Sequence, residues 1–68
     1  MKNVNYNLIK MLHNTLDDEW RIHKFYIKDA KSGCKECAKI MERICMDLER
    51  HLRMLTKELQ SHAKKGLK

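Results

Sequence analysis

The stretch KSGC, residues 31–34, separates two long segments that share a helical period. It contains Gly33, the only glycine in the interior of the chain, and Ser32, a residue type that often caps the first turn of a helix. Glycine commonly ends a helix, and a short polar connection lets the chain turn back on itself. We therefore expect an antiparallel two-helix hairpin with its turn at residues 32–34.

The segments on either side of this turn carry apolar residues at intervals of three and four, which is the period of an α-helix. No strand-like alternation competes with it, and proline is absent. We expect an all-α fold in one domain, residues 1–68, with the first helix at about 4–31 and the second at about 35–64. The expected buried positions are Leu8, Leu12, Leu16, Ile22, Tyr26 and Ala30, then Cys37, Met41, Ile44, Leu48, Leu52, Leu55 and Leu59, with Ile9, Trp20 and Ile27 at the edge.

The length of the chain limits the core that it can form alone. A 68-residue hairpin cannot cover two apolar stripes of this length. Two hairpins can cover them by closing a four-helix bundle around shared core layers. We expect the chain to pair with itself as a homodimer or a higher even oligomer.

The charge and cysteine content bear on partners and compartment. The net charge is +6, but the basic residues are spread along the chain, which favours a solvated surface over a nucleic-acid face. No apolar run approaches the length of a membrane span, and no secretory signal is evident. Three cysteines are an odd count for a secreted disulfide framework, so we expect a cytoplasmic protein. A basic interaction module that binds a protein partner is the non-enzymatic alternative.

Polar residues interrupt the apolar stripes. Glu19 falls on the stripe of the first helix, where an unpaired buried carboxylate would be costly. On the second helix, Asp47 and His51 lie four residues apart and so on the same side. A hairpin folded about Gly33 brings Glu19 level with Asp47, with His51 and His23 each one turn away. These residues indicate a mid-bundle metal site, with ordinary surface ion pairs as the alternative.

Two stretches also resemble a known family. LDDEWRIHKFYIKDA (Leu16–Ala30) and IMERICMDLERHLRML (Ile40–Leu55) are similar to the metal-binding helices of ferritin-like proteins. The similarity is greatest to rubrerythrin-type half-bundles and to encapsulated ferritins, whose two-helix chains form a di-iron site at a dimer interface. The resemblance implies a site that binds iron or another divalent transition metal, and oxidation of Fe(II) by oxygen.

The resemblance also implies roles for individual residues. It makes Glu19 and His51 ligands and places Tyr26 beside the site as an aromatic neighbour of the ligands. The chain departs from the family at Leu48, which stands where the Glu-x-x-His motif has its glutamate. Either Asp47 acts in place of that glutamate and gives an altered site, or the fold is kept without the iron-oxidising chemistry.

A Cys-x-x-Cys motif, Cys34 and Cys37, begins the second helix. The helix end favours thiolates and Lys35 adds positive charge, so these thiols could be redox-active or bind a soft metal. One such motif supplies two ligands, fewer than tetrahedral zinc requires. A redox role, a zinc site and plain packing remain open. Cys45, near the apolar stripe, is expected to be a small buried residue.

Overall fold

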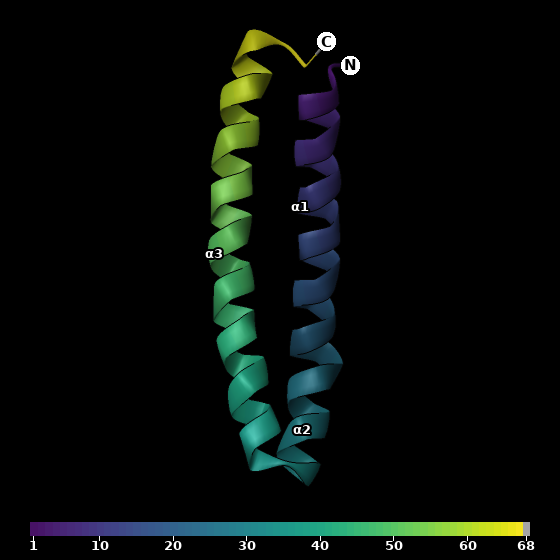
Figure 1. Ribbon diagram of the computed structural model, residues 1–68, viewed down its shortest axis with the longest axis vertical. Coiled ribbons are helices and arrows are strands. Elements are labelled where there is room, and N and C mark those ends of the chain that lie inside the picture. Colours follow the sequence, from purple (N-terminus) through teal and green to yellow (C-terminus); the bar gives the residue numbers. More distant parts are fainter. Residues whose placement is uncertain (68) are drawn as a thin grey trace.

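The computed structural model describes residues 1–67, which form two helical arms lying side by side (Figure 1). The first arm contains α1 (Asn3–Arg21), a π-helical turn η1 (Ile22–Tyr26) and α2 (Ile27–Gly33). The second arm is the single helix α3 (Lys35–Lys65). The molecule measures 47 × 15 × 14 Å, and both termini lie at the end opposite the turn (Figure 1). The prediction of an all-α fold is confirmed.

The length and hydropathy of the same helices bear on membrane insertion. Over residues 1–67, neither arm contains a helical stretch both long enough and apolar enough to cross a bilayer.

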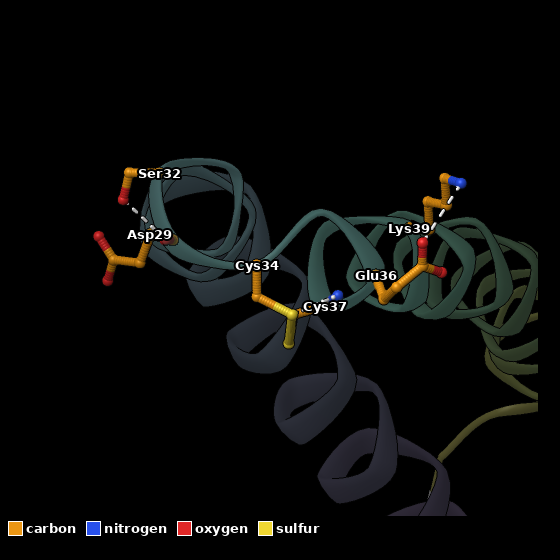
Figure 2. The surroundings of a disulfide bond; sticks show 6 residues. All are labelled: Asp29, Ser32, Cys34, Glu36, Cys37 and Lys39. Carbon is orange, nitrogen blue, oxygen red and sulfur yellow. Dashed lines mark hydrogen bonds and ion pairs between the residues drawn. A yellow bond between two sulfur atoms is a disulfide. The ribbon is translucent and has the colours of Figure 1, made fainter.

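The connection between the arms is tighter than expected. Only Cys34 leaves the helical conformation, with φ −159° and ψ 105°. Its Sγ accepts a hydrogen bond from the backbone N–H of Cys37 at 3.0 Å and so caps α3. Ser32 instead donates its hydroxyl to the carbonyl of Asp29 at 2.8 Å, in the last turn of α2 (Figure 2). The prediction that Ser32 caps the second helix is wrong, because the first arm stays helical through Gly33.

The π-helical turn changes the phase of the first arm. Ile22 is buried at 3% exposure, and the next residue to face α3 is the half-buried Ile27, five positions later. An uninterrupted α-helix would place residue 26 there, but a π turn holds one extra residue. Tyr26 is therefore rotated outward and is 46% exposed. The expectation that Tyr26 is buried and Ile27 lies at the edge is wrong for this reason.

At several points the residue that is buried between the arms is the sequence neighbour of the one expected. In α3, Ala38 and Cys45 are buried, whereas Cys37 and Ile44, which were expected to be buried, are exposed. With the buried Ala38 and Cys45, a set of half-buried residues completes a series at intervals of three and four along α3: Met41, Leu48, Leu52, Leu55, Leu59 and His62. In α1, Thr15 takes the buried position expected for Leu16. This spacing is that of antiparallel helices packed as in a coiled coil.

A polar contact joins the arms near the termini. Asn5 is buried at 2% exposure, and its side-chain amide donates to the carbonyl of Leu67 at 3.0 Å. Its Oδ1 atom lies 2.7 Å from Nδ1 of His62, whose Nε2 lies 3.0 Å from Glu58. Asn5 thus connects α1 to the last turn of α3 and to the segment that follows it.

Replacing Asn5 with alanine should lower the free energy of unfolding by about 1–3 kcal/mol, because buried partners lose their hydrogen bonds. Urea unfolding followed by circular dichroism, at one fixed protein concentration, measures this change. The matched control is Asn7→Ala, since Asn7 lies in the same helix but is exposed. Equal losses for the two variants would contradict a role for Asn5 in joining the arms.

Candidate metal centre

Four side chains of metal-binding type converge between the arms. Glu19 comes from the end of α1, His23 from η1, and Cys45 and Glu49 from α3. One ligand atom from each lies within 4.8 Å of the others. Residues four apart share one side of a helix, so each arm presents its pair toward the other arm.

The Nε2 atom of His23 lies at the centre of the group. It is 2.9 Å from a carboxylate oxygen of Glu19, 3.2 Å from one of Glu49 and 3.0 Å from the sulfur of Cys45. The Cys45 sulfur is 3.7 Å from Glu49. In a tetrahedral site with bonds of about 2.0–2.3 Å, neighbouring ligand atoms are about 3.3–3.8 Å apart. The 3.7 Å separation falls in this range and the three made by His23 are up to about 0.4 Å too short, so the side chains would have to move apart slightly to enclose an ion.

The group is buried on one side and open on the other. Cys45 is 4% exposed and the two carboxylates are half-buried, whereas the side chain of His23 is 53% exposed. Burial raises the pKa of the Cys45 thiol, and the negative charges of Glu49 and Glu19 raise it further. Without a cation the thiol therefore keeps its proton. A divalent ion would neutralise the carboxylates and displace that proton on binding.

The structure brings together Glu19 and His23 of the predicted ligands. It does not bring Asp47 or His51 into the group. Asp47 lies 3.7 Å from Arg50 in an ion pair on its own helix, and His51 is exposed. His51 instead lines a groove of about 520 Å³ between the arms. The other residues that line this groove are Met11, Thr15, Met54, Leu55 and Glu58.

The difference follows from the register of the hairpin. The expected fold about Gly33 set Glu19 opposite Asp47, whereas the chain turns at Cys34. Glu19 and Glu49 lie equally far before and after Cys34, and so do His23 and Cys45. Moving the facing residue by two positions turns it about half-way round the helix, so Glu49 replaces Asp47. The sequence signal for Cys45 and Glu49 was this symmetric placement of two pairs spaced by four.

The residues singled out by the ferritin-like resemblance beyond Glu19 lie elsewhere. Tyr26 and Leu48 line a second groove of about 250 Å³, together with Asp18, Ile22, Met41 and Ile44. Each of the four cluster residues is the next residue in sequence after one that lines this groove. The pairs are Asp18 and Glu19, Ile22 and His23, Ile44 and Cys45, and Leu48 and Glu49. One residue is about 100° of helix rotation, so the cluster and the groove occupy different sides of the hairpin.

The Cys-x-x-Cys motif forms a separate feature at the turn. Cys34 and Cys37 are joined in a disulfide, and Cys45 is the free cysteine. In this oxidised form neither sulfur of the motif is available to bind zinc. Cys45 is buried as expected, but its sulfur contacts polar ligands rather than apolar side chains alone.

Comparisons of the chain with protein-family models, with curated proteins and with solved structures found no match. The geometry and chemistry of the four side chains are therefore the basis for a function. Glu19, His23, Cys45 and Glu49 form a group that could hold a metal ion.

In the metal-free protein, Cys45 should react slowly with iodoacetamide, because a raised pKa lowers the thiolate fraction at neutral pH. At each pH its rate should be lower than that of an ordinary thiol, and the rise of the rate with pH should be displaced to higher pH than in the unfolded chain. Mass spectrometry of the alkylated protein measures this rate, since the disulfide protects the other two cysteines. The urea-unfolded protein serves as the control, and equal rates in the two states at pH 8 would contradict the shift.

Proposed function

We propose that this chain is a metal-binding helical hairpin whose ligands are Glu19, His23, Cys45 and Glu49. The observation that supports this proposal is the convergence of one imidazole nitrogen, one thiol and two carboxylates from both arms. A structural ion pair would need a single carboxylate at the histidine. Here one ring nitrogen lies against two carboxylates and the Cys45 sulfur, and its single N–H cannot serve all three. A cation bound among them satisfies all four side chains together.

The donor set favours a transition metal. Thiolate and imidazole ligands select against Mg²⁺ and Ca²⁺, which prefer oxygen alone. Zn²⁺ accepts sulfur, nitrogen and carboxylate oxygen in a tetrahedral arrangement and fits this set best. Iron, which the ferritin-like resemblance implies, is the alternative occupant. Held by all four ligands, Zn²⁺ would have a closed coordination shell and would link the two arms, whereas Fe(II) would be open to oxidation by oxygen.

Each residue has a distinct part in this proposal. Cys45, buried at the base, would supply a thiolate whose proton leaves as the metal enters. Glu19 and Glu49 would balance the metal charge from the two arms. His23, the most exposed of the four, lies on the side through which an ion or a small ligand can enter.

Metal titration of the chelator-treated protein, with the Cys34–Cys37 disulfide intact and Cys45 as the free thiol, should show one Zn²⁺ or Co²⁺ per chain, with thiolate-to-cobalt absorption in the Co²⁺ form. His23→Ala and Cys45→Ala should each weaken binding by at least about tenfold, because each removes a ligand directly. Saturating metal at about 100 times Kd should stabilise the fold by about 2.7 kcal/mol. Uptake of oxygen on addition of Fe(II) separates iron oxidation from simple zinc binding.

The matched controls are His51→Ala and Asp47→Asn, which change the same residue types outside the cluster. Both variants should bind metal as the parent protein does. The proposal fails if the parent binds no metal, or if His51→Ala weakens binding as much as His23→Ala.

We further propose that two chains pair into a four-helix bundle. Among residues 1–67, only Ile22, Ala38 and Cys45 are buried hydrophobic residues, and no side chain is fully enclosed. Twelve large hydrophobic side chains are at least 41% exposed. An isolated hairpin with so small a core would be marginal, and pairing would bury part of this surface.

The groove between Met11 and Met54 is the surface that we assign to this pairing. It is larger than the groove that Tyr26 and Leu48 line, about 520 Å³ against about 250 Å³, and its lining is mainly apolar. His51 and Glu58 line it as well, so a two-fold arrangement of identical grooves would offer the imidazole of each chain to the carboxylate of the other as a hydrogen-bond partner.

The parent protein should have a mass in solution of two 8.2 kDa chains by light scattering. Met54→Glu and Met11→Glu should shift it toward a single chain, because a carboxylate would be buried unpaired in the interface. Met46→Glu is the matched control, since Met46 is 65% exposed but lies outside the groove. A single-chain mass for the parent at about 100 μM would rule out the dimer as a stable species.

A further inference from the structure

We propose that Cys34 and Cys37 form a redox site that exchanges electrons with low-molecular-weight thiols and their disulfides. The site is independent of the proposed metal centre, because it lies at the turn and shares no residue with the cluster. Figure 2 shows the disulfide at the start of α3, where the chain passes from one arm to the other.

The exposure of the two sulfur-bearing residues differs. Cys37 is exposed in the first turn of α3, whereas Cys34 is half-buried at the cap position. Their Cα atoms are 5.1 Å apart. A thiol from solution can therefore approach Cys37 more readily than Cys34, and access is one of the factors that decide which sulfur is attacked.

The surroundings favour negative charge on the sulfur of Cys34. The backbone N–H of Cys37 donates to it at 3.0 Å, at the N-terminus of a 31-residue helix. Lys35 follows Cys34 directly in sequence and adds positive charge. The negative charge of the nearby Glu36 is offset by Lys39, whose Nζ lies 3.6 Å from it in an ion pair. A thiolate stabilised in this way is a good leaving group.

These two properties define the exchange. The thiolate of a small thiol attacks the sulfur of Cys37, a mixed disulfide forms there, and the bond between the cysteines breaks with Cys34 leaving as a thiolate. A second small thiolate then attacks the sulfur of the first small thiol and releases Cys37. The small thiols lose two electrons and become a disulfide, and their two protons end on Cys34 and Cys37. The reverse sequence reoxidises the protein.

The bond is poorly placed to act as a structural staple. It closes a loop of sequence separation three, and short loops restrict the unfolded chain least. Backbone hydrogen bonds hold the same turn without it, from Cys34 N–H to Ala30 at 2.7 Å and from Ala38 N–H to Cys34 at 3.0 Å. The helical arms can therefore persist in both redox states.

The test uses the full chain, freed of metal with a chelator so that the outcome does not depend on the metal proposal. The protein is equilibrated with reduced and oxidised glutathione at varied ratios, quenched with acid, alkylated and analysed by mass spectrometry. The ratio of dithiol protein to disulfide protein should change reversibly. It should be proportional to the square of the reduced glutathione concentration divided by the concentration of oxidised glutathione. Helix content by circular dichroism should stay the same.

Single-cysteine variants test the assigned roles. In Cys37→Ser, Cys34 should react with iodoacetamide at pH 7 about tenfold faster than Cys45 of the same chain. In the parent, peptide mapping of acid-quenched samples should find the glutathione adduct on Cys37. A cysteine pair that stays oxidised, or stays reduced, at every glutathione ratio would overturn the redox site. An adduct on Cys34 alone would overturn the proposed direction of attack.

Discussion

The π-helical turn at Ile22–Tyr26 is the constraint on which the hairpin depends. The apolar stripe of the first arm has an interval of five between Ile22 and Ile27, and a regular α-helix cannot keep both residues against α3. Widening one turn absorbs the extra residue and lets both halves of the arm contact the same partner helix. Such turns are frequent at functional sites, and this one contains His23, the central member of the cluster.

The interface between the arms is specified as much by polar groups as by apolar ones. Asn5 and Thr15 are both buried, and Thr15 donates its hydroxyl to the carbonyl of Met11 at 2.7 Å. Over residues 1–67, no buried side-chain nitrogen or oxygen lacks a hydrogen-bond partner. The Thr15 bond lies within α1 and is independent of register, whereas Asn5 would lose His62 and Leu67 as partners in another register, so the Asn5 contacts favour a single alignment of the arms. The small core leaves the hairpin in need of further buried apolar surface. The exposed methionines and aromatic residues provide surface that pairing of two chains would bury.

The two kinds of cysteine show how surroundings decide thiol chemistry. Cys45 is enclosed beside two carboxylates, which disfavour its thiolate until a cation arrives. Cys34 lies at a helix N-terminus with a backbone N–H directed at its sulfur, which favours negative charge there. The same side chain is thus suited to metal binding in the middle of the hairpin and to electron exchange at its turn.

The sequence by itself determined the helical class, the two arms and the turn to within one residue, because periods of three and four and a break between two long periodic segments are local signals. It also identified Glu19 and His23 as polar residues near the contact surface. It could not decide their partners, since a change of two residues in register exchanges Asp47 for Glu49 and removes His51 from the group. The outward direction of Tyr26 likewise depended on the π turn, which forms because Ile22 and Ile27 both pack on α3. Only the tertiary structure decided these points, because register and phase depend on the contact between arms rather than on either helix alone.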